Sequence, residues 1–424
     1  MIYWLKRILY FPIASYFRFF AVIRLKLWRP KIIVVTGSNG KTTLLHLLEA
    51  QLGDKAKYSH HANSSFGIPF DILGLKRKTL LKTEWIGLFL AAPLRVFAKL
   101  PREKIYVVET DCDRPGEGKF LADLLKPEVV LWVSTSRTHS MSFDNLIARK
   151  SFKNVEEAIA YEFGYFLEYC KSLAVINGDS LLEKQQVMRT KAIVKEIIKN
   201  KVLDKYETNV NGTKFVINDK VYKFKDLLPE EIFYSIEMCK ILIEYLNLPF
   251  DEKFSNFIIP PGRSSIFEGI KETTIIDSSY NANFSSMSAV LKMYREFPAK
   301  TKWAVIGDML EQGKEEQEEH EKLAELLAKQ DLARIIFLGP RVNKYTFPKL
   351  KSLISNTIPV DSFINPKEVL DFLNEHLKGE ETILFKGARF MEGVIEHLLK
   401  NKSDAIKLSR REKIWEIRRS EWGL

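Results

Sequence analysis

Residues 36–43, with the sequence Thr-Gly-Ser-Asn-Gly-Lys-Thr-Thr, have types and a spacing that suit the binding of a phosphate group. Glycines let backbone N–H groups approach an anion, a lysine adds a fixed charge, and a hydroxyl can ligate magnesium. The usual phosphate loop has a glycine four residues ahead of its final Gly-Lys pair, and Val35 stands at that place. We therefore predict a shortened phosphate loop that binds a nucleotide through Gly37, Ser38, Asn39, Gly40, Lys41, Thr42 and Thr43.

The elements expected around this loop are those of a parallel α/β domain. Apolar runs predict buried strands at residues 32–35, 104–108 and 128–133, and helical periodicity predicts helices at 42–52 and 117–125. Ligands bind at the carboxyl ends of parallel strands. Glu109 follows the second of these strands and His139 follows the third, so both are candidate magnesium ligands together with the Thr42 hydroxyl.

A second α/β domain is predicted after the Pro-Pro-Gly-Arg segment at residues 260–263. Its expected strands are 273–277, 302–306, 334–338 and 382–385, and its expected helices are 285–297, 315–329, 366–376 and 390–399. The fold class is therefore α/β: a central P-loop-type ATPase domain with a parallel sheet, plus a smaller Rossmann-like C-terminal domain. We expect a segment at 1–30, the central domain at 31–259 and the C-terminal domain at 260–424.

Composition limits the class of protein. Of the 424 residues, 46% are hydrophobic and 28% charged, which describes a globular protein. The three cysteines have no metal-ligand spacing and fit a reducing, cytoplasmic compartment. The net charge of +11 lies mainly in residues 1–30 and 400–424. A nucleic-acid partner is not expected, because no basic face runs through the middle of the chain. The basic charge at the two ends could serve contact with a membrane surface, binding of an anionic substrate or simple solubility, and these three explanations remain open.

Two further segments allow alternatives. Residues 1–30 are aromatic and basic, and their longest uncharged run, 8–17, is far below the roughly 20 residues of a membrane span. They predict either a helix lying on the inner face of a membrane or a helix packed on the first domain. The adjacent His60 and His61 could bind a metal, but no third ligand has suitable spacing, so surface histidines are expected. The apolar stretch 85–100 is expected in the core.

Together these motifs, in this order, resemble the Mur ligase family, and most closely its UDP-N-acetylmuramoyl-tripeptide–D-alanyl-D-alanine ligase branch. The resemblance covers roughly residues 31 to 400. The matching segments are residues 36–42, Asn63 with Gly67-Ile68-Pro69, Glu109, residues 114–117, His139, the Asn-Gly-Asp turn at 177–179, Arg263, residues 277–283, residues 306–311 with His320, and residues 385–389.

The resemblance implies an ATP-dependent acid–amino acid ligase working on a cell-wall precursor. A carboxylate would take the γ-phosphoryl group of ATP, and an amine would then displace phosphate from the acyl phosphate. Lys41 would hold phosphates, Thr42 one Mg²⁺, and Glu109 with His139 a second. Further nucleotide contacts are implied for Arg263, Asp277, Tyr280 and Asn281, and substrate contacts for Asn63, Asn283, Lys386 and Arg389. The expected partners are a small-molecule carboxylate acceptor and an amino acid or peptide.

The sequence also departs from the family pattern. Phe163 stands where many members have a lysine, carbamylated to bridge magnesium, so Glu162, water or weak metal binding would have to compensate. Ser278 and Phe284 replace an aspartate and a proline. The usual N-terminal UDP-binding domain is absent from the sequence, which suggests a lipid-linked acceptor or a partner subunit. A ligase for a folate-like or poly-amino-acid acceptor and a nucleotide-binding scaffold without turnover therefore remain as alternatives.

Overall fold

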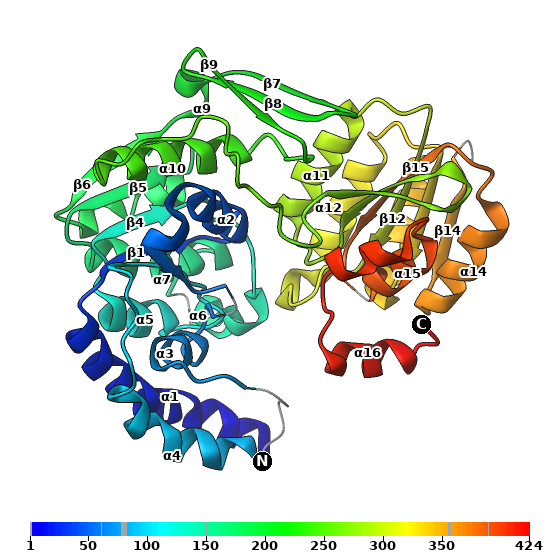
Figure 1. The fold of residues 1–424 in the computed structure, drawn as a ribbon. Helices are drawn as coiled ribbons and strands as arrows, with labels where there is room; N and C mark the ends of the chain where they lie inside the picture. Colours follow the sequence, from blue (N-terminus) through cyan, green and yellow to red (C-terminus); the bar gives the residue numbers. More distant parts are fainter. Residues whose placement is uncertain (1, 61, 78–82, 150, 355–357, 389) are drawn as a thin grey trace. The chain divides into compact units, whose positions relative to one another are not determined.

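The structure, a computed structural model, describes residues 2–60, 62–77, 83–149, 151–354, 358–388 and 390–424 (Figure 1). The chain forms two compact units. The first consists of residues 1–136, 142–202 and 234–258, and the second of residues 137–141, 203–233 and 259–424. The last division between the units falls between residues 258 and 259, one residue before the expected boundary between 259 and 260. Residues 203–233, which were expected in the central domain, are grouped with the second unit.

The first unit is built on a six-stranded sheet in which every neighbouring pair is parallel. In spatial order its strands are β2 (Ala56–Tyr58), β3 (Ile105–Glu109), β1 (Lys31–Thr36), β4 (Val129–Trp132), β5 (Leu173–Asn177) and β6 (Ile193–Ile197). The central strands are apolar throughout because helices cover both faces of the sheet. Sequence patterns did not predict β2, which has three residues, or β6, which is largely polar and exposed.

Helices cover the two faces of this sheet unequally (Figure 1). One face carries α1 (Ile2–Trp28), α3 (Gly67–Leu73), α4 (Glu84–Val96), α5 (Glu117–Leu125) and α7 (Val155–Glu168) over a single apolar core. The opposite face carries α2 (Lys41–Leu52) and α10 (Ile232–Tyr245), where the Cys239 thiol lies 3.7 Å from the carbonyl of Leu47. The short helices are α6 (Asp144–Ala148), α8 (Leu181–Lys184) and α9 (Lys199–Val202).

Helix α1 packs on the first unit. Its buried residues Phe17, Ala21 and Trp28 belong to the core under the sheet. The Arg24 guanidinium donates hydrogen bonds to four carbonyls in the last turn of α4 and just beyond it, those of residues 95, 96, 98 and 99. Among the described residues, no helix combines the length and the apolar character needed to cross a bilayer.

The expectation that stretch 85–100 is core is correct for only one face of α4. Leu88, Ala92 and Val96 are buried, whereas Leu90 and Leu94 are exposed. The physical reason is that α4 lies outside α1 and α3, so only the stripe that faces those helices can be covered (Figure 1).

The second unit contains a mixed six-stranded sheet. In spatial order its strands are β10 (Ser265–Glu268), β11 (Thr274–Ser278), β15 (Glu381–Lys386), β12 (Thr301–Gly307), β13 (Arg334–Leu338) and β14 (Val360–Phe363). Only β10 runs antiparallel to its neighbour. One face packs on α11 (Phe284–Glu296), α12 (Glu316–Leu327) and α13 (Phe347–Leu353), and the other on α14 (Pro366–His376) and α15 (Met391–Leu398). The predicted α/β fold class is confirmed.

A small antiparallel sheet and the chain terminus complete the second unit. An antiparallel meander is formed by β7 (Leu203–Asn209), β8 (Gly212–Ile217) and β9 (Lys220–Phe224). The C-terminal segment ends in α16 (Lys413–Ser420). Its arginines pair with carboxylates of α15: Arg411 with Glu396, and Arg410 with the buried Glu392. Part of the basic charge near the C-terminus therefore holds the chain end in place.

Candidate active site

The phosphate loop joins β1 to α2 through two glycines with positive φ. Gly37 has φ 129° and Gly40 has φ 83°. A Cβ on Gly37 would lie 2.7 Å from the carbonyl oxygen of Ser134, and one on Gly40 would lie 2.9 Å from a methyl group of Val133. Neither position has room for a side chain, and both backbone conformations disfavour one. The two glycines therefore let the loop pack closely against the segment after β4.

The segment after β4 holds this loop in place. The Ser38 N–H donates to the Ser134 carbonyl at 2.9 Å, and the Asn39 N–H donates to the Ser134 hydroxyl at 2.9 Å. The Ser38 hydroxyl donates to the carbonyl of Ser136 at 2.8 Å. The Asn39 amide donates to the Ser136 hydroxyl at 2.8 Å. These bonds fix the loop before any ligand binds, which is the preorganisation that an anion site requires.

Lys41 is the first residue of α2, and its ammonium is buried. Its Nζ lies 2.5 Å from the carbonyl of Gly37 and 2.8 Å from a carboxylate oxygen of Asp111. Burial by itself disfavours the charge, but Asp111 and Glu109 outweigh it and raise the pKa of Lys41. The lysine is therefore a fixed cation at the loop. Asp111 was not predicted; the available signal was a second acid two residues beyond Glu109 at the end of a parallel strand.

Glu109 and Thr42 lie together, as a shared magnesium site requires. The Thr42 hydroxyl is 3.3 Å from a carboxylate oxygen of Glu109, which is itself buried at the end of β3. The Glu109 N–H donates to the Ser59 hydroxyl at 2.9 Å, which ties β3 to the residue after β2. A hydroxyl and a carboxylate oxygen are ligands that Mg²⁺ accepts. Asn63 contacts this group of residues through its backbone: its carbonyl accepts a hydrogen bond from the Asp111 N–H at 2.8 Å.

His139 belongs to the second unit, where its Nδ1 lies 2.5 Å from a carboxylate oxygen of Glu311. Both residues have positive φ, 51° and 62°. Glu311 was not assigned a role from the sequence, although it ends the matched segment 306–311. The expected magnesium pair of Glu109 and His139 is thus distributed over the two units, and it stays a prediction.

In the second unit Asp277 and Lys386 lie on neighbouring strands and are both buried. Register places Asp277 opposite Phe385 and Ser278 opposite Lys386. Burial, and then the charge of Arg263, lower the pKa of Lys386 to about 7, although Asp277 opposes the shift. Burial raises the pKa of Asp277, although the Ser279 hydroxyl and N–H both donate to its Oδ1. Two cationic side chains near a single buried carboxylate leave an excess of positive charge that suits an anion.

Tyr280 and the two asparagines near it have distinct roles. The Arg263 guanidinium stacks over the half-exposed Tyr280 ring, 4.6 Å from its centre. The Asn281 carbonyl accepts from Lys386 Nζ at 2.5 Å. The Asn283 side chain is buried and accepts the Ser286 N–H at 2.8 Å, so it caps α11. Its predicted substrate role stays a prediction, and Arg389 lies outside the described residues.

Comparison with known proteins supplies the family. A family model described as the Mur ligase middle domain matches residues 35–230, and one described as the Mur ligase, glutamate ligase domain matches residues 262–389. The chain belongs to the Mur ligase family. The resemblance stated from the motifs is therefore confirmed.

Several relatives of this Mur ligase carry the same name, UDP-N-acetylmuramoyl-tripeptide–D-alanyl-D-alanine ligase. The proteins from Buchnera aphidicola subsp. Acyrthosiphon pisum and from Escherichia coli K12 are each 24% identical, over 88% of this chain and 77% of theirs. A solved MurF ligase from Thermotoga maritima, in complex with ADP, superposes with a TM-score of 0.71 at 21% identity, covering 93% of this chain and 84% of that one. The prediction of an ATP-dependent ligase is confirmed.

Phe163, the main departure from the family pattern, is a core residue of this Mur ligase. It is fully buried in α7, and its ring centre lies 5.8 Å from that of Trp132. The neighbouring Glu162 accepts the N–H groups of Gly116 and Gly118, at 2.7 and 2.9 Å, at the start of α5. Glu162 therefore caps a helix, which does not favour it as the replacement metal ligand.

Two residues of the matched motifs in the second unit, Asp308 and His320, have structural roles. Asp308 is fully buried and accepts the N–H groups of Arg341 and Val342 at 2.9 and 3.0 Å. His320 accepts the Met309 N–H at 3.3 Å, and its other ring nitrogen lies 2.7 Å from the Glu316 carbonyl. Burial lowers the pKa of His320. These bonds require a neutral imidazole that fixes the loop after β12.

Proposed function

We propose that this Mur ligase joins an amino acid or a short peptide to the carboxylate of a peptidoglycan-precursor peptide through an acyl phosphate. The observation that carries the proposal is the buried pair of Lys41 and Asp111 at a glycine loop, next to Thr42 and Glu109. Relatives whose names specify a muramoyl tripeptide and D-alanyl-D-alanine support this substrate class.

The residues of the first unit fit a magnesium-bound nucleotide. A Cβ at Gly37 or Gly40 would collide with Ser134 or Val133, so glycine at both positions keeps the loop in its conformation at the start of α2, where backbone N–H groups would face phosphate oxygens. Lys41 supplies a fixed positive charge, and Thr42 with Glu109 supplies oxygen ligands for Mg²⁺. Bound ATP supplies the phosphoryl group that activates the acceptor carboxylate. The protein contributes positioning and charge, which is most of what phosphoryl transfer needs.

The second unit has cationic groups that suit the negative charges of the reactants and a carboxylate that suits a hydroxyl group. Arg263 and Lys386 offer cationic groups near Asp277, whose Oδ2 has no hydrogen-bond partner among the described residues. A buried carboxylate oxygen without a donor is costly, and a ribose hydroxyl would satisfy it. An anionic group at Arg263 and Lys386 would in turn keep the lysine protonated.

The test is phosphate release from ATP and Mg²⁺ with pools of muramoyl-peptide or lipid-linked acceptors and of amino acids or D-alanyl dipeptides. We expect turnover that needs both an acceptor and an amine and that Lys41→Ala abolishes. Lys55→Ala is the matched control, because Lys55 is an exposed lysine just beyond the same helix. A folate-like acceptor that supports turnover when muramoyl acceptors do not would replace the substrate class and keep the reaction.

A nucleotide-binding scaffold is the second candidate, and Phe163 is the observation that favours it. Neither Phe163 nor Glu162 is placed to hold a metal, so a ligand that many family members possess is missing from α7. If the protein binds ATP but no combination of acceptor and amine releases phosphate, the scaffold is the correct function and the ligase proposal fails.

We also propose that the protein works in the cytoplasm and contacts the inner face of a membrane through α1 and α4. The two helices pack together, with the Tyr16 hydroxyl donating to the Phe89 carbonyl at 2.8 Å. Ile86, Leu90 and Leu94, four residues apart, form an exposed apolar stripe on α4, with exposed fractions of 69, 69 and 76%. Exposed basic residues lie at and just beyond the C-terminal ends of the two helices: Lys26, Arg29, Arg95, Lys99 and Arg102. This combination suits an anionic bilayer surface.

Co-sedimentation with liposomes tests the membrane contact. The wild type should bind vesicles containing phosphatidylglycerol more than neutral vesicles, and Leu90→Glu/Leu94→Glu should release it. Met188→Glu is the control, because Met188 is 89% exposed and lies outside α1 and α4. Equal sedimentation of the wild type and the double variant would exclude this surface for lipid and leave a partner subunit as its occupant.

A further inference from the structure

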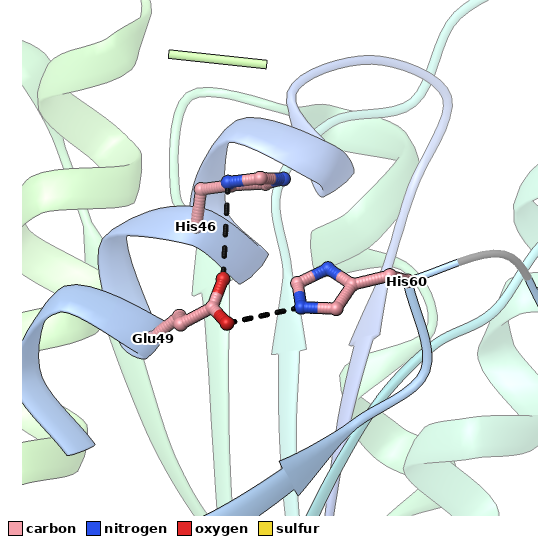
Figure 2. A group of neighbouring side chains, drawn as sticks. All are labelled: His46, Glu49 and His60. Atoms are coloured by element: carbon pink, nitrogen blue, oxygen red, sulfur yellow. Dashed lines mark hydrogen bonds and ion pairs between the residues drawn. The ribbon is translucent and has the colours of Figure 1, made fainter. Parts of the chain in front are cut away.

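Three side chains of the first unit converge at a place that the proposed ligase reaction does not use (Figure 2). His46 and Glu49 lie one turn apart on α2, and His60 follows β2. Glu49 carries one carboxylate oxygen 3.9 Å from His46 Nδ1 and the other 3.1 Å from His60 Nε2. The ligand atoms of the three residues all lie within 4.8 Å of one another.

We propose that His46, Glu49 and His60 form a binding site for a Zn²⁺-type divalent cation. Two imidazole nitrogens and one carboxylate are a ligand set that zinc takes in proteins, usually with water in the fourth position. The donor set argues against Mg²⁺ and Ca²⁺, which prefer oxygen ligands. A cluster of acids alone would not discriminate in this way; the two histidines carry the inference.

The geometry needs only a small adjustment to close on an ion. Around a tetrahedral zinc with bonds of about 2.0–2.2 Å, ligand atoms are about 3.3–3.6 Å apart. One Glu49 oxygen lies 3.1 Å from His60 Nε2 and the other lies 3.9 Å from His46 Nδ1. The three ligand atoms lie within 4.8 Å of one another, so they would have to move closer together to reach the tetrahedral separation. All three side chains are half-buried, so an ion and a water molecule can reach them. The two histidine rings are neighbours, with centres 5.2 Å apart and planes inclined at 51°.

Neighbouring groups hold His60 in this orientation. The Tyr58 ring stacks on it at 5.7 Å with an interplanar angle of 30°, and the Tyr58 hydroxyl donates to the Gly53 carbonyl at 2.9 Å. Residues that fix a histidine ligand in this way contribute to metal affinity. The ion would join α2, which begins with Lys41, to the segment that leads to Asn63. None of its three ligands takes part in the proposed ligase reaction, so metal binding can be measured without turnover.

Titration with Co²⁺ tests the site directly, since tetrahedral Co²⁺ with imidazole ligands absorbs visible light. We expect one equivalent to bind the wild type, one equivalent of Zn²⁺ to displace it, and excess Mg²⁺ to leave it in place. His46→Ala and His60→Ala should each lower the Co²⁺ affinity at least about tenfold, because loss of a ligand costs no less than loss of a supporting contact. Glu49→Gln should weaken binding as well.

His376→Ala is the matched control. His376 lies on α14 in the second unit, 4.0 Å from a carboxylate oxygen of Glu375, and belongs to no cluster of three potential metal ligands among the described residues. This variant should bind Co²⁺ like the wild type. Circular dichroism without metal should show that all the variants fold, since the three side chains are half-buried. The proposal is overturned if the wild type binds no stoichiometric Co²⁺, or if His46→Ala and His60→Ala bind it with unchanged affinity.

Discussion

The buried ammonium of Lys386 makes the stability of the second unit depend on pH in a direction that can be worked out. Its side chain is 3% exposed, and its pKa is lowered from 10.5 to about 7, first by burial and then by Arg263. Between pH 7 and pH 10.5 the unfolded chain therefore holds a proton that the native protein has released. Stability must rise with pH across this range, by up to about 1.4 kcal/mol per pH unit.

The substitution Lys386→Met isolates this effect, because methionine has an unbranched side chain of similar length but carries no charge. Between pH 7 and pH 9 the wild type should gain about 2 kcal/mol relative to the variant, allowing for partial protonation near pH 7. Hydrogen exchange of the peptides that contain β11 and β15 reports the stability of this unit by itself. Lys300→Met is the control, because that ammonium is exposed and should leave the pH dependence as in the wild type.

The decisive quantity is the difference between wild type and Lys386→Met in the slope of stability against pH, because the contributions of the other titrating groups are the same in both proteins and cancel. The absolute stability of Lys386→Met is less informative, since the variant also loses the hydrogen bond to the Asn281 carbonyl. Equal slopes for wild type and Lys386→Met would show that the lysine stays protonated, which would refute the argument that burial dominates over its pairing with Asp277. A slope of the opposite sign would refute it as well.

Three further outcomes follow from the geometry. Lys41→Met should lower the free energy of unfolding of the first unit in urea by about 3 kcal/mol, because it leaves the buried Asp111 carboxylate without its ion-pair partner. The double variant Lys41→Met/Asp111→Leu should recover that stability without recovering turnover. Gly37→Ala should lower ATP affinity about tenfold or more in calorimetry, because its Cβ would meet the Ser134 carbonyl at 2.7 Å. The second unit should lose stability as the pH falls below about 6.5, where only unfolded His320 is protonated, and His320→Gln should flatten that part of the acid-unfolding curve.

Much of the fold could be predicted from the sequence because local rules agree with the tertiary structure. The helices at 117–125 and 366–376 and the strand at 334–338 have the predicted bounds. In each, apolar periodicity coincides with the face that the sheet covers. The prediction failed where the environment, and not the residue types, decides the structure. Strand β6 alternates little and lies at a sheet edge, and it forms because β5 offers it backbone partners.

The candidate site likewise contains residues that could be predicted from the sequence and residues that could not. Residue types with few alternatives, such as Gly37, Gly40 and Lys41, could be placed on a phosphate loop from their spacing alone. Asp111 could not, because its partner is decided by the parallel register that sets Glu109 opposite Val35 and brings the following residues to Lys41. The metal cluster is a second example: spacing along the chain offered no third ligand for His60, whereas β2 brings it next to α2.

The shortened loop itself shows why a motif must be interpreted with its surroundings. Gly37 and Gly40 are separated by two residues, whereas four separate the glycines of the usual pattern, so the turn between strand and helix is shorter. Here Gly37 compensates with its positive φ and a close approach to Ser134, and three side chains of the loop and of the segment after β4 exchange hydrogen bonds. The geometry of the phosphate site therefore depends on a strand almost 100 residues further along the chain. For the same reason, Ser134→Ala should weaken ATP binding in calorimetry although that residue is outside the motif, and unchanged affinity would show that the loop is stable without it.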